Sequence, residues 1–312
     1  MLFMNKLKVG VIGTGHLGSI HARIYKKLPE CELVGVCDVD QKRLKEVSRE
    51  LNVPGFSDYR ELFPLVEAVS IASSTPTHYA IAKECLENNL HALVEKPFTT
   101  ELKHAQQLIE ISEKKGLILQ VGHIERFNSA FDATRRLIYH PKFIECHRLS
   151  PFPNRSLDVG AVLDIMIHDI DIVLGLVDSP IKRIDSVGTK VLTQFEDIAN
   201  ARITFENGCV ANLTASRISD EFMRKIRIFQ ESTYISLDYK AAKAVVYRKD
   251  GLNISKENLP IEKEEPLPKE LRHFVACVKE NRQPLVSGKI AAEALAVALK
   301  IQDQIWDKNT SS

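Results

Sequence analysis

The first 122 residues alternate short apolar runs with amphipathic stretches of helical period. The apolar runs predict strands at 7–12, 32–37, 68–73, 91–94 and 117–121, and the stretches between them predict helices at 16–28, 41–50, 77–88 and 101–115. Buried strands that alternate with helices are typical of a parallel sheet with helices on both faces. We therefore expect an α/β fold with a doubly wound dinucleotide-binding domain over residues 1–122.

The pattern changes after residue 122. Helices are predicted at 129–139 and 160–176, with a strand at 143–149 between them, and the tail returns to helix at 268–280 and 289–307. Between these helices lie six strand-like segments in succession: 183–192, 198–205, 209–218, 224–230, 233–238 and 243–248. Strands that follow one another without helices pair mainly antiparallel, and Asn207-Gly208 predicts a hairpin between two of them. We expect a second, α+β domain with a largely antiparallel sheet over residues 123–312.

A glycine-rich loop joins the first strand to the first helix. Its residues, Gly13, Thr14, Gly15, His16, Leu17 and Gly18, fit the G-x-G-x-x-G pattern. Gly13 permits a tight turn, Gly15 lets the backbone approach a pyrophosphate, and Gly18 lets the helix pack closely on the strand. The helix N-terminus then offers N–H groups to the anion. The glycines, with His16 and Leu17, are candidate cofactor-binding residues.

Asp38 bears on the choice of cofactor. It stands twenty positions after Gly18, at the end of the second apolar run. A carboxylate there accepts hydrogen bonds from both ribose hydroxyls and repels a 2'-phosphate, so NAD is favoured over NADP. The alternative is that Asp38 is an ordinary helix N-cap beside a glycine-rich turn.

Two further groups of polar residues suggest catalysis. Lys96, within Glu95-Lys96-Pro97, follows the strand at 91–94 at the carboxyl edge of the sheet, where open α/β folds bind ligands. Asp164, His168 and Asp171 are spaced by four and three in an apolar stretch, so one helical face presents all three. Buried polar groups without partners are costly, so these groups need partners or a function. The alternatives are a surface lysine and a hydrogen-bonded core histidine.

These motifs, together with Ser74-Thr75-Pro76-Thr77-His78, resemble in order those of the glucose-fructose oxidoreductase and inositol dehydrogenase family, the Gfo/Idh/MocA group. The resemblance extends over essentially the whole chain. It implies that Ser74, Thr75, His78 and Glu95 lie at the cofactor and that Asp164 and His168 close the site from a helix of the second domain. The implied reaction is reversible oxidation of a secondary alcohol of a sugar by NAD. His168, oriented by Asp164, or Lys96 is the base, and the sequence leaves that choice open.

Residues 122–128 and 149–155 resemble the subgroup that oxidises C3 of UDP-N-acetylglucosamine. That resemblance makes Arg126, Asn128, Arg155 and Asp171 candidate substrate-binding residues, since arginines suit a diphosphate. The chain departs from the subgroup at Ser129, where proline is usual, and from many relatives at Met166, where they have glycine. An inositol or free-sugar dehydrogenase, and a non-catalytic NAD sensor, remain alternatives. The catalytic set argues against a sensor, which needs only the glycine loop and Asp38.

Composition adds limits. The chain has 312 residues, a net charge of +1 and 27% charged residues, which favours neither a nucleic-acid nor a membrane surface. Its six cysteines lack C-x-x-C or metal-ligand spacing, so we expect neither a disulfide framework nor a metal site. With no membrane-length apolar stretch and no signal-peptide pattern, a cytoplasmic protein is expected. The family resemblance implies a homodimer or homotetramer.

Overall fold

The computed structural model describes residues 6–152 and 158–310. The chain forms two compact units, one of Met1–His123 with Leu267–Ala292 and the other of Ile124–Pro266 with Glu293–Ser312. Residues 123–312 were predicted to form one domain, whereas in the structure Leu267–Ala292 belongs to the first unit. The reason is α7 (Pro266–Glu280), whose Leu271 and Phe274 pack with Tyr25 in the first unit's core.

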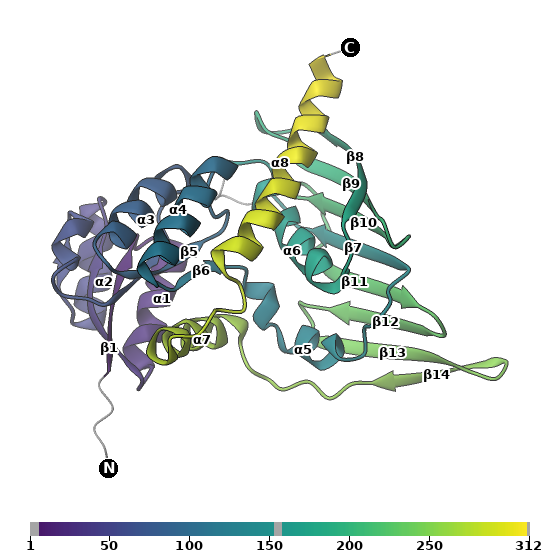
Figure 1. Cartoon of the computed structure of the whole chain (residues 1–312), viewed down its shortest axis with the longest axis horizontal. Coiled ribbons are helices and arrows are strands. Elements are labelled where there is room, and N and C mark those ends of the chain that lie inside the picture. The colour runs from purple at the N-terminus through teal and green to yellow at the C-terminus, as the bar shows by residue number, and fades with distance from the viewer. Residues whose placement is uncertain (1–5, 153–157, 311–312) are drawn as a thin grey trace. The chain divides into compact units, whose positions relative to one another are not determined.

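The first unit is built on a six-stranded parallel sheet with the strand order β3-β2-β1-β4-β5-β6 (Figure 1). This order is that of a doubly wound dinucleotide-binding fold, with its switch point between β1 and β4. The strands are β1 (Leu7–Ile12), β2 (Cys31–Cys37), β3 (Gly55–Phe56), β4 (Ala68–Ile71), β5 (His91–Glu95) and β6 (Leu119–Gly122). The predicted α/β class is confirmed.

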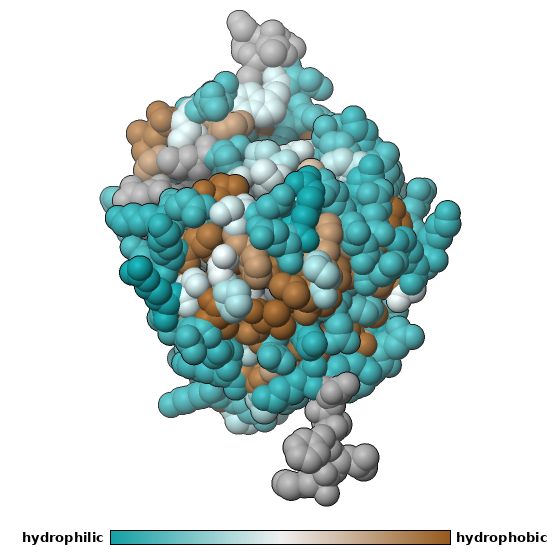
Figure 2. Space-filling view, turned by 90° about the vertical axis from the view of Figure 1, so that its left-hand side faces the viewer, coloured by the Kyte–Doolittle hydropathy of each residue, from teal (hydrophilic) through white to brown (hydrophobic). Residues whose placement is uncertain are grey.

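Helices cover this sheet because its strands are apolar on both faces. Val9, Ile71 and Leu93 are fully buried on three neighbouring strands. The connections supply α1 (His16–Lys27), α2 (Gln41–Leu51), α3 (His78–Glu87) and α4 (Leu102–Lys115). Figure 2 shows the side of the molecule on which α2 lies in Figure 1. Most of the surface in this view is hydrophilic, and apolar side chains gather near its middle.

The second unit is built on an eight-stranded sheet with the order β14-β13-β12-β11-β7-β10-β9-β8. Only β7 and β10 pair in parallel, and all other neighbours are antiparallel, as predicted. The turn at Asn207-Gly208 joins β9 to β10, with Gly208 at φ +83°. The strands are β7 (Phe143–Leu149), β8 (Ile181–Thr189), β9 (Ile198–Phe205), β10 (Val210–Ser216), β11 (Met223–Gln230), β12 (Thr233–Asp238), β13 (Lys243–Asp250) and β14 (Asn253–Asn258).

Helices pack on one face of this second sheet. They are η3 (Ile124–Phe127), α5 (Ser129–Arg135), the π-helical turn η4 (Val162–Met166), α6 (Ile167–Leu176) and most of α8 (Gly288–Thr310). Ser186 Oγ donates to the carbonyl of Ile301, and Gln304 Nε2 donates to the carbonyl of Ile184, so α8 is bonded to β8. The alternate residues of β9 to β12 are buried beneath the helices. On the other face the residues of β10 to β12 are partly exposed, and Asn200 and Arg202 of β9 are exposed.

Three elements differ from the sequence prediction. β3 is two residues long and β14 is exposed throughout, so neither has the buried alternation that marks a strand. The helix predicted at 160–176 begins instead with η4. At its start, Glu196 Oε1 accepts the N–H of Val162 and the Glu196 carbonyl accepts that of Ala161.

Candidate functional site

The glycine loop of the first unit has the geometry of a phosphate cradle. Gly13 has φ +92°, and a side chain there would lie 2.6 Å from the carbonyl oxygen of Ala72. A Cβ at Gly18 would lie 1.8 Å from the carbonyl oxygen of Gly13, whereas a Cβ at Gly15 would meet nothing within 4 Å. Two glycines therefore permit close packing, and the third faces open space where a pyrophosphate can approach. His16 and Leu17 are exposed at the start of α1.

Asp38 is fixed beside this loop, just after β2. Its Oδ2 accepts hydrogen bonds from the backbone N–H (2.6 Å) and the hydroxyl (2.9 Å) of Thr14, and its Oδ1 accepts from the N–H of Asp40 (2.8 Å). The N-cap of α2 is Asp40, which accepts from Lys42 and Arg43. Asp38 is thus not the helix cap, and its carboxylate is held against the glycine loop, which leaves ribose binding as the predicted role. The sequence analysis gave Thr14 no role.

The segment after β4 is tied to the segment after β5 by a histidine. Ser74 is exposed and Thr75 is buried in a single 3-10 turn, η2 (Thr75–Thr77). His78 is buried, with Nδ1 2.9 Å from the carbonyl oxygen of Pro97 and Nε2 3.1 Å from that of Ser73. The ring of His78 thus bridges two backbone segments at the sheet's carboxyl edge, and its place at the cofactor stays a prediction.

Lys96 and Glu95 lie at the same edge but differ in burial. Lys96 is partly exposed, whereas Glu95 is buried with Oε1 3.1 Å from Nε2 of His21. His21 Nδ1 is 2.7 Å from the hydroxyl of Ser70. Burial favours the neutral form of Glu95, but His21, Lys96 and His78 outweigh it and lower the pKa of this carboxyl. Glu95 thus points into the core, while Lys96 remains at the edge where a nicotinamide would lie.

The second unit carries the other half of the predicted site. Asp164 lies in η4 and His168 in the first turn of α6, and their exposed fractions are 8% and 9%. A π-helical turn inside a helix is often found at functional sites, because it changes the direction of the side chains that follow.

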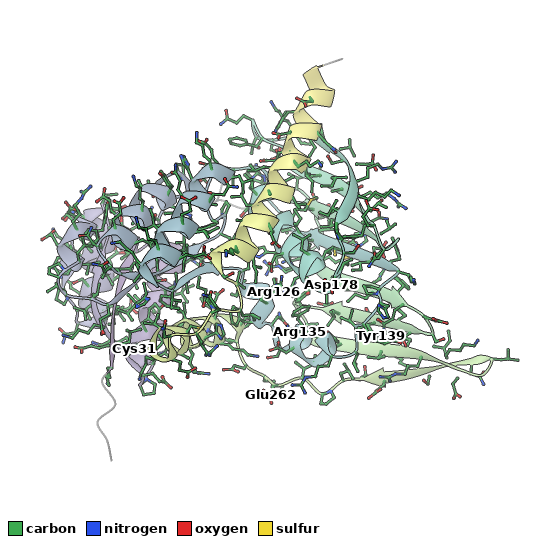
Figure 3. All side chains as sticks on the ribbon, viewed as in Figure 1. Cys31, Arg126, Arg135, Tyr139, Asp178 and Glu262 are labelled. Carbon is green, nitrogen blue, oxygen red and sulfur yellow. The ribbon has the colours of Figure 1, made fainter. Side chains whose placement is uncertain are left out.

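Asp171 is paired with Arg126. Figure 3 labels Arg126. Its Nε lies 2.6 Å from Oδ2 of Asp171, and its Nη2 lies 3.0 Å from Oδ1 and 2.7 Å from the carbonyl oxygen of that residue. Gly175 makes room for this guanidinium, since a Cβ there would lie 2.1 Å from Nη1 of Arg126. Both residues were expected to bind substrate, and the structure gives them each other as partners.

A second buried arginine lies next to this pair. Arg148 donates to Glu125 Oε1 (2.8 Å) and to Asp169 Oδ1 (2.8 Å). Burial opposes the charge of Arg148, but the two carboxylates outweigh it and raise its pKa. Asn128 caps α5 by accepting from the N–H of Ala130, and its Nδ2 is 3.3 Å from Glu125 Oε2. Arg155, the remaining predicted substrate residue, lies outside the described residues.

The sequence analysis missed the role of Asp169. The available signal was a third acid, beside His168, within an apolar run. Arg148 and Arg126 therefore hold α6 through two acids, Asp169 and Asp171, that closely follow His168.

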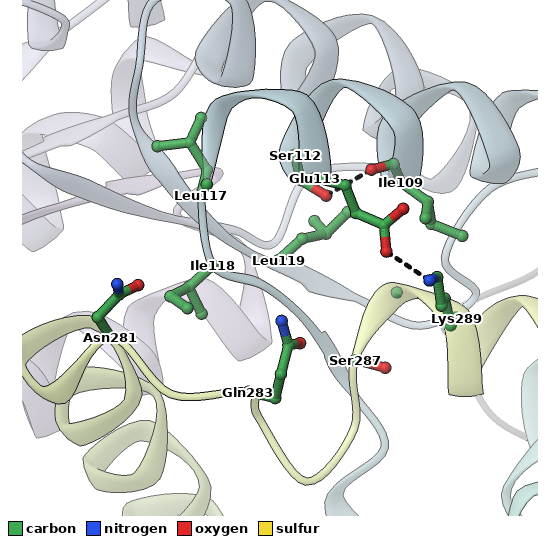
Figure 4. A pocket seen from close by; sticks show the side chains of 12 residues that line it. Ile109, Ser112, Glu113, Leu117, Ile118, Leu119, Asn281, Gln283, Ser287 and Lys289 are labelled. Atoms are coloured by element: carbon green, nitrogen blue, oxygen red, sulfur yellow. Dashed lines mark hydrogen bonds and ion pairs between the residues drawn. The ribbon is translucent and has the colours of Figure 1, made fainter.

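A separate pocket of about 300 Å³ lies in the first unit between α4, β6 and the α7–α8 connection (Figure 4). Ser112, Glu113, Gln283 and Ser287 are among its lining residues, and Lys289 forms an ion pair with Glu113 at 2.5 Å. None of the predicted site residues that the structure describes lines it, so we assign it no part in the site.

The sheet order, the glycine loop and Asp38 define the first unit as an NAD-type Rossmann domain. The chain belongs to the Gfo/Idh/MocA oxidoreductases: the family model described as "Oxidoreductase family, NAD-binding Rossmann fold" matches residues 7–123, and the model of the GFO/IDH/MocA C-terminal domain matches residues 120–235. The expected dehydrogenase class and NAD cofactor are confirmed. No helix in the described part of the chain is long and apolar enough to cross a membrane.

Relatives match over nearly the whole chain. UDP-N-acetylglucosamine 3-dehydrogenase of Acidithiobacillus ferrooxidans is 35% identical, over 96% of this chain and 97% of that protein. Its solved structure superposes with a TM-score of 0.92, over 97% and 98% of the two chains. Myo-inositol 2-dehydrogenase of Thermotoga maritima is 27% identical, over 97% of this chain and 98% of that protein.

Proposed function

We propose that this protein oxidises the C3 hydroxyl of UDP-N-acetylglucosamine to a ketone with NAD. The observation that carries the proposal is the full-length similarity, at 35% identity, to a dehydrogenase of that name. The presence of Lys96, Asp164 and His168 supports catalysis rather than cofactor sensing, because binding NAD requires only the first unit's loop and acid.

The first unit would hold NAD with its own backbone and four side chains. The Gly13–Gly18 loop would donate N–H groups to the pyrophosphate, and Asp38 would accept from the ribose hydroxyls. Ser74, Thr75 and Lys96 would lie along the nicotinamide half. The bound nicotinamide supplies a hydride acceptor, and every other step belongs to the protein.

The chain's residues would manage the proton of the substrate hydroxyl. We assign His168 as the base, since histidine side chains ordinarily titrate near neutrality, and Asp164 as the acid that orients its ring. Lys96 would stabilise negative charge on the substrate oxygen as the proton leaves. The Arg126–Asp171 and Arg148–Asp169 pairs would keep α6, and with it His168, in a fixed orientation.

Substrate contacts require a cation that is not already paired. Arg126 and Arg148 each have buried carboxylate partners. On the resemblance of residues 149–155 to the UDP-N-acetylglucosamine subgroup, we propose that Arg155 binds the diphosphate. Asn128 and Asp171 remain proposed substrate-side residues of the second unit. The second candidate substrate is an inositol, favoured by the full-length relatives of Thermotoga maritima and Bacillus subtilis.

Turnover with a panel of substrates tests the proposal. The purified protein, NAD and either UDP-N-acetylglucosamine, free N-acetylglucosamine or myo-inositol are mixed, and absorbance of reduced cofactor is followed. A 3-keto product that is unfavourable at equilibrium requires a coupled aminotransferase or a carbonyl trap in every arm. Oxidation of myo-inositol alone would favour the second candidate.

We further propose a homodimer or homotetramer that pairs through the exposed face of the second sheet. Phe143, Phe229, Tyr234 and Tyr247 form a continuous row of stacked rings on four neighbouring strands, with centroids 4.6 to 5.7 Å apart. Light scattering of the wild type and Tyr234→Arg tests the assembly, which the substitution should weaken.

A cytoplasmic location is also proposed, because six buried cysteines without disulfide bonds suit a reducing compartment.

A further inference from the structure

The first unit contains a buried carboxyl group that the proposed function does not use. Glu270, on α7, is fully buried, and neither of its carboxylate oxygens has a hydrogen-bond partner among the described residues. A buried polar group without partners is costly, and an isolated buried charge is costlier still. Glu270 therefore needs a reason to be there.

The surroundings of Glu270 connect it to the Lys96 segment. Gln120 Nε2, on β6, is 3.4 Å from the backbone carbonyl oxygen of Glu270, which joins α7 to the sheet. Burial and the nearby carboxylate of Glu95 raise the pKa of Glu270 well above its ordinary value. The titratable groups around the two carboxyls are Tyr25 and His21 of α1, His78 of α3 and Lys96 after β5.

The two carboxyls differ in their partners. Glu95 has His21 at 3.1 Å on Oε1, and its Oε2 accepts the backbone N–H of Lys96 at 3.3 Å. Its carboxyl lies against β6, since a Cβ on Gly122 would be 2.9 Å from it. Glu95 therefore has compensating partners, whereas neither carboxylate oxygen of Glu270 has a hydrogen-bond partner among the described residues.

We propose that Glu270 is a positioning residue for Lys96. As a neutral carboxylic acid, Glu270 leaves Glu95 as the one charged member of the two carboxyls at the end of β5. Glu95 can then hold His21 with one oxygen and the Lys96 backbone with the other. If Glu270 lost its proton, a second buried charge would repel Glu95 and disturb the Lys96 segment. The inference rests on the role proposed for Lys96, but the protonation of Glu270 can be tested without it.

Infrared spectroscopy tests the protonation directly. At pH 7 the wild type should show the carbonyl stretch of a buried carboxylic acid, which Glu270→Gln should lack. Glu95→Gln should still have this band. As pH rises, the band should disappear at a lower pH than in the wild type, because the negative charge of Glu95 no longer repels a charge on Glu270. The wild-type measurement needs no variant to fold. A band that is absent from the wild type, or unchanged in Glu270→Gln, would overturn the proposal.

The pH dependence of kcat and of NAD binding tests the positioning role. Glu270→Gln imitates the neutral acid, so at pH 7 its kcat should stay within about twofold of wild type. At alkaline pH, where the wild type loses kcat and NAD affinity, the variant should lose much less. Glu280→Gln, at the exposed end of α7, is the control and should follow the wild type. If Glu270→Gln had the wild-type pH profile, or lost more than about tenfold in kcat at pH 7, the role would be disproved. Inactivity on UDP-sugars would affect the proposed function alone, since NAD binding and the infrared band need no substrate.

Discussion

Arg126 and Asp171 stand 45 positions apart and form a buried bidentate ion pair, with Nε 2.6 Å from Oδ2 and Nη2 3.0 Å from Oδ1. The pair joins η3 to α6, three residues after His168. Because this guanidinium is bonded to Asp171, we expect Arg126 to support α6 rather than to bind a diphosphate.

Breaking this pair should reduce stability and turnover together. Arg126→Met leaves Asp171 as an unpaired buried charge, which should cost about 3–5 kcal/mol of unfolding free energy. Gly175→Ala should act in the same direction, because its new Cβ would displace the guanidinium. Denaturant unfolding and calorimetry check this, and NAD affinity should not change. If Arg126→Met kept its stability and raised only the KM for the sugar nucleotide, Arg126 would be a substrate ligand after all.

Asp38 should determine the preference for NAD. The wild type should bind NAD at least tenfold more tightly than NADP, a difference of about 1.4 kcal/mol, and Asp38→Ser should narrow it. The carboxylate is already oriented by Thr14, so the effect should not require rearrangement of the loop. Asp40→Asn is the matched control, since asparagine also caps helices and should leave the preference intact. Equal wild-type affinities in calorimetry would contradict this assignment.

Lys96 and His168 should act mainly on the chemical step. Lys96→Met should leave NAD binding nearly intact and reduce kcat by roughly two orders of magnitude or more. His168→Ala should reduce kcat similarly and flatten the pH profile near neutrality, which identifies it as the base. A neutral limb that survives in His168→Ala but disappears in Lys96→Met would reverse the two roles.

Glu270 should make stability depend on pH. Its pKa is raised in the folded protein above an unfolded value near 4.5, so the folded state keeps a proton that the unfolded chain releases. The free energy of unfolding should therefore fall as pH rises from about 4.5 to the folded pKa. Glu270→Gln removes this term, and its stability advantage over the wild type should grow across that interval in denaturant titrations. A constant difference between the two proteins would rule out a shifted pKa.

Local patterns in the sequence predicted most of the fold. The strands of the first unit are continuous apolar runs, and the glycine loop is a motif of adjacent residues. Both can therefore be recognised in short segments of the sequence. β14 was not predicted because all of its side chains are exposed. The amphipathic pattern of α7 predicted a helix but could not say which core its apolar face would join.

Long-range pairs limited the prediction of the site. An acid or arginine inside an apolar run signals that a partner is needed, but the sequence does not name the partner. Arg126 could therefore be taken for a phosphate ligand, and the contact of Glu95 with His21 was not foreseen. Thr14 and Glu270 carry no local signal strong enough to distinguish them from other polar residues.

The most direct test of the account is NAD reduction by UDP-N-acetylglucosamine with the 3-keto product removed by a trap. The wild type should reduce NAD with this substrate, free N-acetylglucosamine should be much poorer, and Arg155→Ala should weaken use of the UDP-sugar without changing NAD affinity, since nucleotide binding energy positions the ring. The exposed Arg183→Ala serves as the control and should behave as the wild type. Efficient oxidation of free sugars or inositols, with no advantage for the UDP-sugar, would contradict the proposed function.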